Sequence, residues 1–146
     1  MKLVAENKRA RFDYELLDLY EAGIVLTGDE IKSVRLGHFS IVDCYGFIKD
    51  GECFLRNSYI KEYSNSFDAG RFGDKTRRDR KLLLHKQEIL KIKKKLETEH
   101  LTLVPTKSYF DGSNLKVEIA VARGKKLFDK RETLKKKDIE KNLRKL

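Results

Sequence analysis

The sequence has little of what holds secreted, membrane-bound or metal-stabilised proteins together. Its 146 residues include two cysteines, one proline and no tryptophan. No apolar run approaches the length of a membrane span, and the opening residues, MKLVAENKRAR, lack the apolar core of a signal peptide. These absences predict a cytoplasmic protein without a membrane partner.

The two cysteines are predicted to be packing residues. Asp50-Gly51 is a two-residue hairpin signal and places Cys53 opposite Ile48. Cys44 then lies four residues beyond Ile48, roughly 13 Å away, which is too far for a disulfide. No histidine stands at ligand spacing from either cysteine, so no zinc site and no other cofactor is expected.

Catalytic signatures are missing as well. The chain has no GxxxxGK phosphate loop, no HExxH metal motif and no GxSxG elbow. Its carboxylates lie among lysines, which is a poor environment for raising a pKa. We therefore predict no catalytic residue and no enzymatic activity.

Positive charge is what the sequence has in excess. Lys and Arg number 33 against 23 Asp and Glu, which gives a formal charge of +10. Such a surplus favours a polyanion, and nucleic acid is the commonest polyanion for a cytoplasmic domain of this size. The run NKRAR, residues 7–11, holds three cations just before a strand and favours a phosphate contact over a solvated arm.

The stretch EAGIVLTGDEIKSVRLG, residues 21–37, predicts a strand followed by a short helix. A turn over residues 20–23 leads into a buried strand over residues 24–26. Thr27 and Glu30 then stand at the spacing of a capping box, and a glycine at position 37 suits the left-handed residue that closes a helix. The helix presents two cations, Lys32 and Arg35, on its open side.

Alternation of polar and apolar residues predicts the other strands. Residues 12–16 alternate and residues 17–19 continue out of phase, which indicates a bulge. One hairpin joins residues 40–49 to 52–59, and a looser one joins 101–110 to 115–122 through DGSN. Pro105 has no N–H to donate and is expected on an edge or at a bulge.

Residues 64–80 are polar, end in a run of arginines and predict an exposed loop. Residues 82–96 predict the clearest helix, capped by Asp79 or Thr76, with apolar residues at steps of three and four. His85 falls on this stripe and is expected to be packed in the core. The lysines of the opposite side suggest a solvated face.

About six strands in hairpins and two helices predict a mainly β fold with some α. We expect residues 1–122 to form a six-stranded antiparallel β-barrel of the OB type, with short capping helices near 28–36 and 80–97. Such barrels hold single-stranded or folded RNA against one face.

The last segment, residues 123–146, has eleven Lys or Arg against four Asp or Glu, a surplus of seven. Its few aliphatic residues are too sparse to dock against a barrel. We predict a basic, flexible tail that is disordered when free and becomes an amphipathic helix on a polyanion.

Four motifs, NKRARFDY, EAGIVLTGDEIKSVRLG, RKLLLH and VEIAVARGKKLFDKRE, resemble in their order and separation the SmpB family of transfer-messenger RNA binding proteins. The resemblance covers nearly the whole chain. It implies an adaptor in trans-translation, which binds the tRNA-like domain of transfer-messenger RNA and takes the place of its missing anticodon arm in the ribosomal A site. The implied partners are this RNA and the ribosome, at the 16S rRNA decoding centre and mRNA channel, and indirectly elongation factor Tu and alanyl-tRNA synthetase through the shared RNA.

The resemblance also implies RNA-binding roles for particular residues. Asn7 would hydrogen-bond RNA, and Glu21 would accept hydrogen bonds from base amino groups. Leu83 would offer an apolar surface to an unstacked base, as against simple packing beside Leu82. The expected phosphate contacts are the cations Lys8, Arg9, Arg11, Lys32, Arg35, Lys125 and Lys126.

In the tail, Asp129, Lys130 and Arg131 resemble the DKR motif of the family, whose place is the decoding centre. Phe128 stands where relatives carry a histidine or tyrosine, so it retains stacking but loses hydrogen bonding from the ring. A ribosomal or ribosome-assembly protein is the alternative from another class, and a ribonuclease is a distant third.

Overall fold

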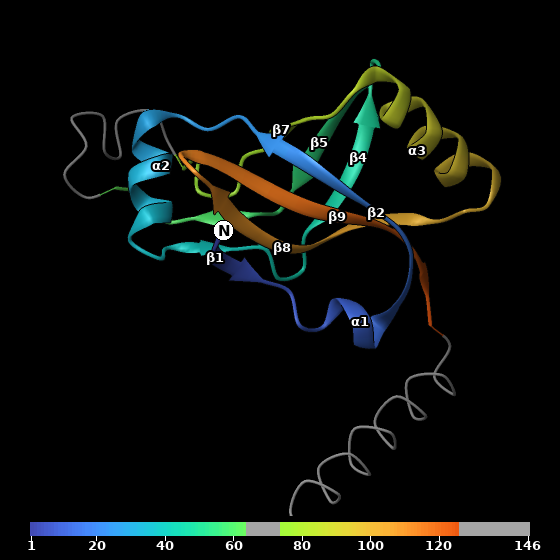
Figure 1. The fold of residues 1–146 in the computed structure, drawn as a ribbon, viewed down its shortest axis with the longest axis horizontal. Helices are drawn as coiled ribbons and strands as arrows, with labels where there is room; N and C mark the ends of the chain where they lie inside the picture. Colours follow the sequence, from blue (N-terminus) through green and yellow to red (C-terminus); the bar gives the residue numbers. More distant parts are fainter. Residues whose placement is uncertain (64–73, 126–146) are drawn as a thin grey trace, which may run out of the picture.

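The computed structural model describes residues 1–63 and 74–125, which form β-sheets with three short helices (Figure 1). The elements in chain order are β1 (Lys2–Glu6), α1 (Ala10–Asp13), β2 (Tyr14–Ile24), α2 (Gly28–Arg35), β3 (Phe39–Ser40), β4 (Tyr45–Lys49), β5 (Glu52–Arg56), β6 (Tyr59–Ile60), β7 (Arg80–Leu83), α3 (Lys86–Thr98), β8 (Thr102–Asp111) and β9 (Asn114–Gly124). The mainly β class is confirmed, although these residues contain nine strands where six were predicted. Most of the predicted loop and nearly all of the predicted tail lie outside the described residues.

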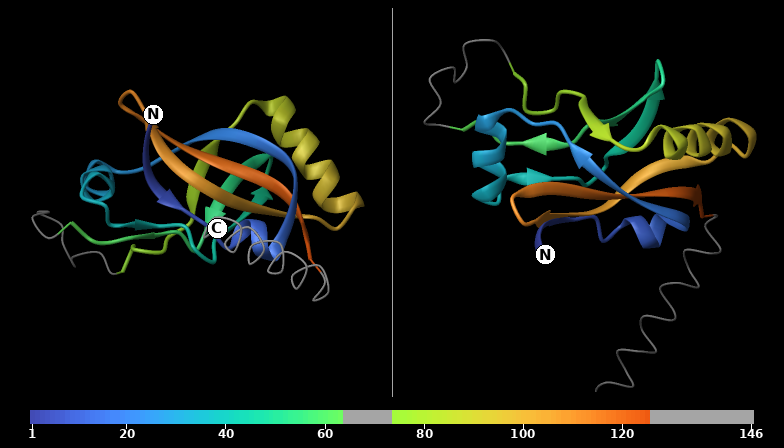
Figure 2. Two further views of the ribbon diagram at one scale, coloured as in Figure 1. Left: turned by 60° about the horizontal axis from the view of Figure 1, so that its bottom comes forward. Right: turned by 45° about the horizontal axis from the view of Figure 1, so that its top comes forward.

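The main sheet is antiparallel, and its strand pairings form a closed ring that begins and ends at β8. In the described residues the order is β8, β4, β5, β7, β2, β9, and β9 pairs with β8 again. One edge of β8 is thus occupied by β9, and the other is shared by β4 and the additional strand β1. β3 and β6 form a separate small sheet. Figures 1 and 2 show α2 and α3 at opposite ends of this arrangement.

The N-terminal third differs from its prediction in two places. Phe12 belongs to α1 rather than to a strand, and β2 runs straight through residues 20–23, where a turn was predicted. β2 pairs with β9 over most of its length, and this long ladder keeps the chain extended where the local sequence favours a turn. The predicted bulge is confirmed by a register shift between Leu16 and Asp18. The strand ends at Ile24, so Val25 lies outside it and is 45% exposed.

Helix α2 begins and ends through the residues that the sequence indicated. The Oγ1 of Thr27 accepts a hydrogen bond from the Glu30 backbone N–H, and the Glu30 carboxylate accepts one from the Thr27 backbone N–H, which completes the capping box. Gly37 has a φ of +86°, and its N–H donates to the carbonyl of Val34. Glycine adopts this left-handed conformation without a Cβ clash, so the helix terminates cleanly.

Both predicted hairpins form, with tight turns. Lys49 pairs with Glu52 across Asp50-Gly51, both of which have positive φ as a type I′ turn requires. The second hairpin is tighter than predicted, because Asp111 pairs directly with Asn114. At Pro105 the register of β8 against β9 shifts, which confirms the predicted bulge.

The region around the third helix is where the sequence prediction was least accurate. Residues 80–83 form the strand β7, which pairs with β2 and β5, so α3 begins only at Lys86. His85 is the N-cap of α3 and is exposed, so the prediction of a packed core histidine was wrong. Neither Asp79 nor Thr76 caps the helix. Ile89 and Ile92 do face the core, as their spacing predicted.

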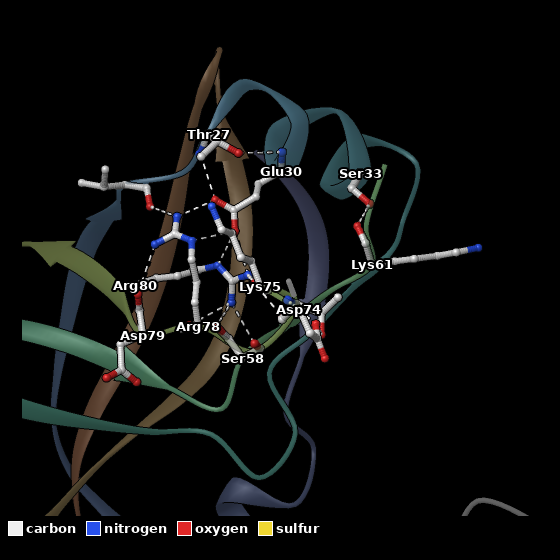
Figure 3. Close-up of polar contacts among 12 residues, drawn as sticks. Thr27, Glu30, Ser33, Ser58, Lys61, Asp74, Lys75, Arg78, Asp79 and Arg80 are labelled. Carbon is white, nitrogen blue, oxygen red and sulfur yellow. Dashed lines mark hydrogen bonds and ion pairs between the residues drawn. The ribbon is translucent and has the colours of Figure 1, made fainter. Parts of the chain in front are cut away.

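Arg80, predicted to end an exposed loop, is completely buried (Figure 3). Its guanidinium forms an ion pair with the Glu30 carboxylate at 2.7 Å and donates to the carbonyl and hydroxyl oxygens of Ser58, each at 2.8 Å. Arg78 donates to the same carboxylate at 2.5 Å. Burial by itself raises the pKa of Glu30, but the hydrogen bonds from Arg78 and Thr27 and the charge of Arg80 lower it overall. The network ties α2 to the segment that leads into β7.

The main hydrophobic core is enclosed by the ring of paired strands, with contributions from α2 and α3. The alternating positions of β9 that were predicted to face it, Leu115, Val117, Ile119 and Val121, are all buried. Cys44 and Cys53 are free thiols in the same core cluster, which confirms their packing role. Burial raises the pKa of Cys44 to about 12 and that of Cys53 to about 11, so both stay protonated and unreactive at neutral pH. No helix of the described residues is long and apolar enough to cross a membrane.

Candidate functional site

Four adjacent strands, β8, β9, β2 and β7, present one continuous surface, here called the outer face. Side chains alternate along each strand, so the neighbours of the buried core residues of β9 point outward. The strand register places them in two rows. The first row contains Lys107, Glu118 and Glu21, and the second contains Tyr109, Lys116, Gly23 and Leu83.

Glu21 is exposed in the centre of the outer face. The hydroxyl of Tyr109 reaches from β8 and donates a hydrogen bond to its Oε2. Burial, and after it this hydrogen bond, raises the pKa of Tyr109 to about 12, so the hydroxyl remains a donor at neutral pH. Glu118 lies directly opposite Glu21 and accepts a hydrogen bond at 2.5 Å from the hydroxyl of Thr106. Among the described residues, the second oxygen of each carboxylate accepts no hydrogen bond and can therefore receive one from a ligand.

Leu83 lies at the edge of the outer face and is 53% exposed. It pairs with Gly23 of β2, and a Cβ at that glycine would lie 3.4 Å from the Cβ of Leu83. This is an ordinary van der Waals distance, so Leu83 lies directly against β2. Its neighbour Leu82 is 1% exposed and packs in the core, so Leu83 is not a second packing residue. Leu19, on the same side of β2 but beyond Glu21, is 50% exposed and adds a second apolar side chain to the outer face.

Asn7 is held beside the outer face by the bulge in β8. Its Nδ2 donates to the carbonyl of Pro105 at 3.2 Å, and its backbone N–H donates to the carbonyl of Thr106 at 2.8 Å. Its Oδ1 is buried and has no hydrogen-bond partner among the described residues. Since Thr106 also bonds to Glu118, Asn7 is linked through one residue to the first row of the outer face.

The predicted phosphate contacts of the N-terminal segment gather around α1. Lys8, Arg9 and Arg11 are exposed, and the guanidinium of Arg9 lies 4.5 Å from the ring centre of Phe12. Lys125, at the end of β9, donates from Nζ to the carbonyl of Arg11 at 2.9 Å. The structure therefore brings Lys125, the last described residue, together with the segment before β2 as one cationic cluster.

The remaining predicted residues lie elsewhere. Lys32 and Arg35 are exposed on α2, where they contact the rings of Tyr63 and Phe110 at 5.4 and 5.7 Å rather than any other candidate residue. The other predicted residues, Lys126, Phe128, Asp129, Lys130 and Arg131, lie outside the described residues.

Sequence reasoning missed four polar residues of the outer face: Lys107, Tyr109, Lys116 and Glu118. The signal for two of them was present, because the polar positions of β9 alternate with its core positions. The two on β8 could not be assigned to a face without knowing where its bulge lies.

The outer face combines oxygen acceptors, exposed leucines and nearby cations. Acceptors and apolar surfaces contact nucleobases, and cations neutralise phosphates, so this combination suits a nucleic acid. The described residues contain no group of three or more His, Cys, Asp or Glu that could hold a metal ion.

Comparison with known proteins gives a consistent result. The family described as SmpB protein matches residues 4–146. An SsrA-binding protein of Mesorhizobium japonicum is 52% identical over 138 residues, which cover 94% of this chain and 85% of the relative. An SsrA-binding protein of a Sulfurihydrogenibium species is 49% identical over 144 residues, covering 99% and 93%.

A similar solved structure is described as "tmRNA-SmpB: a journey to the center of the bacterial ribosome". Its chain shares 44% identity with this one and superposes with a TM-score of 0.68, covering 88% of this chain and 92% of the solved one. A family match over nearly the whole length, relatives that are about half identical and a shared fold together show that the chain belongs to the SmpB family.

Proposed function

We propose that this protein binds the tRNA-like domain of transfer-messenger RNA and delivers it to stalled ribosomes for trans-translation. The observation that carries the proposal is membership of the SmpB family, whose relatives are named SsrA-binding proteins, over 94% of the chain or more in the two relatives described. The similar solved chain is described together with tmRNA and the bacterial ribosome. In this role the protein is a cytoplasmic adaptor and not an enzyme.

The RNA is held, in this proposal, between the outer face and the cationic cluster around α1. Glu21 accepts hydrogen bonds from base amino groups, and Leu83 supports an unstacked base. Lys8, Arg9 and Arg11 neutralise phosphates beside them. The closed ring of strand pairings supports an OB-like barrel as the scaffold, because such barrels bind RNA across a strand face.

The basic tail has a separate role in the proposal, and it begins after Lys125, because β9 continues to Gly124. In the proposal it is disordered when free and becomes helical in the mRNA channel, with Phe128, Asp129, Lys130 and Arg131 at the decoding centre. Residues 126–146 contain nine Lys or Arg against four Asp or Glu, and this surplus of five positive charges supports binding to ribosomal RNA. Elongation factor Tu and alanyl-tRNA synthetase meet the protein only through the RNA that all three bind.

Incubation with labelled transfer-messenger RNA tests this function. We expect one discrete complex, intact RNA, and a clear preference over a folded competitor RNA of equal length. Shortened RNA would instead indicate a ribonuclease, and equal binding to the competitor would indicate a general ribosomal protein. Either result would refute the proposal.

A further inference from the structure

The exposed side of α3 carries lysines that the candidate site does not use. Lys86, Lys91, Lys93 and Lys94, here called the α3 lysine face, are all exposed. Within the described residues none of the four forms an ion pair or a side-chain hydrogen bond. The lysines before and after this set do form ion pairs: Lys81 with Glu52 at 3.0 Å, and Lys95 with Asp18.

The helix holds this face in a fixed position. Ile89 and Ile92 are buried beneath it, and in its first turn the Glu88 carboxylate accepts a hydrogen bond from the His85 backbone N–H at 3.1 Å. The ion pair from Lys95 to Asp18 joins its last turn to β2. The four lysines are therefore presented by a rigid element, which lowers the entropy lost when a ligand binds them.

The positive charge of α3 is only partly balanced in the free protein, by Glu88 three residues before Lys91 and by Glu97 four residues after Lys93. Helix α3 contains five lysines against two glutamates, a surplus of three. Lys86 occupies the first helical position, where the helix dipole disfavours a cation, and Lys91 lies one turn from Lys94, where like charges repel. A bound polyanion relieves both effects.

The position of α3 next to the candidate site indicates which polyanion binds the α3 lysine face. Leu83 of the candidate site is three residues before Lys86, so their Cα atoms are at most about 11 Å apart. Lys86 and Lys94 are eight residues apart, about 12 Å along the helix axis. Double-stranded DNA carries a phosphate about every 1.7 Å of its axis, and an RNA duplex is at least as densely charged, so a helix of this length lies opposite several phosphates.

We infer that the α3 lysine face is a second phosphate-binding surface for the same RNA that binds the outer face. This inference rests on the proposed function and extends the RNA footprint from β7 along α3, toward the end of the molecule opposite α2 (Figure 1). The ligand it takes is the sugar-phosphate backbone of a duplex region, without regard to base sequence.

The test compares three proteins in binding the isolated tRNA-like domain of transfer-messenger RNA at several salt concentrations. One is the wild type, one carries K86Q, K91Q, K93Q and K94Q, and the control carries K2Q, K49Q, K61Q and K75Q, at exposed lysines outside α3. Glutamine and lysine have similar helix propensities, and thermal unfolding confirms that each variant is folded.

We expect the log–log salt slope of the α3 variant to be shallower than that of the wild type by about 0.9 or more, the value of one phosphate contact, while the control keeps the wild-type slope. A smaller change in the α3 variant, or an equal change in the control, would overturn the inference although the RNA still binds. A wild-type protein with no preference for this RNA would instead refute the proposed function, and the inference with it.

Discussion

Replacing Arg80 by Met tests whether the buried charge network holds α2 and β7 in place. The guanidinium of Arg80 has no exposed surface and pairs with the carboxylate of Glu30, whose side chain is 13% exposed. Methionine has a similar length but cannot pair, so it leaves the carboxylate and the Ser58 carbonyl short of a donor. Removing one partner of a buried pair costs about 3–5 kcal/mol in unfolding free energy. Because Arg78 still binds Glu30, we expect the lower end, about 3 kcal/mol.

The assay is thermal and urea unfolding of the full chain. For a domain of this size, about 3 kcal/mol corresponds to a decrease in melting temperature of about 12 °C. The matched control is Lys81→Met, one residue along the same strand. The Lys81 side chain is 42% exposed and that of its partner Glu52 is 48% exposed, so the loss should stay below about 1 kcal/mol.

The pH dependence provides an independent check. The pKa of Glu30 is lowered in the folded protein from an ordinary value of 4.5, so its stabilising contribution is fully present above that value. It is lost as the pH falls through the folded pKa. The difference between wild type and Arg80→Met should therefore be largest near neutral pH and shrink as the pH falls below 4.5. An effect no larger than that of Lys81→Met, or one independent of pH, would refute this reasoning.

Three further predictions concern RNA binding. Glu21→Gln should weaken binding to the tRNA-like domain about tenfold, the loss of one good base contact, without changing the salt slope; a changed slope in filter binding would point to a phosphate effect instead. Arg9→Ala should flatten the slope by about 0.9, and an unchanged slope would remove Arg9 from the interface. Deletion after Lys125 should spare RNA binding but abolish ribosome rescue, measured as peptide tagging in a purified translation system. The cut belongs there because β9 continues to Gly124 and the Lys125 backbone N–H donates to Asp13; loss of RNA binding in this truncation would contradict the separation of folded domain and tail.

Features decided by a few adjacent residues could be predicted from the sequence. The capping box at Thr27 and Glu30, the turn at Asp50-Gly51 and the bulge at Pro105 all formed as expected. Each depends on a local requirement: a side chain that accepts a backbone hydrogen bond, two residues with positive φ, or a missing N–H. Those requirements involve only neighbouring residues, so they do not depend on which distant segments pack nearby.

Features decided by distant partners could not be predicted. Arg80 appeared to be a loop residue, because its partner Glu30 is fifty residues away in the sequence. Leu82 and Leu83 matched a helical pattern, but pairing with both β2 and β5 makes residues 80–83 a strand. The same cause exposes His85 at the start of α3. In each case the pairing of strands outweighs local propensity. β2 and β5 supply hydrogen-bond partners for the backbone of residues 80–83, so these residues do not need a helix to satisfy their N–H and C=O groups.

The outer face shows how one backbone irregularity decides the composition of the candidate site. Val104 packs in a separate cluster outside the main core, so without the extra residue at the bulge strict alternation would place Ser108 and Phe110 on the outer face and point Tyr109 into the main core. The shift after Pro105 reverses this, so that Ser108 is fully buried and Phe110 is 8% exposed within the core. Tyr109 consequently reaches Glu21. A proline that cannot donate to the ladder thus selects which side chains of β8 lie beside Glu21, the residue of β2 that we propose to bind RNA.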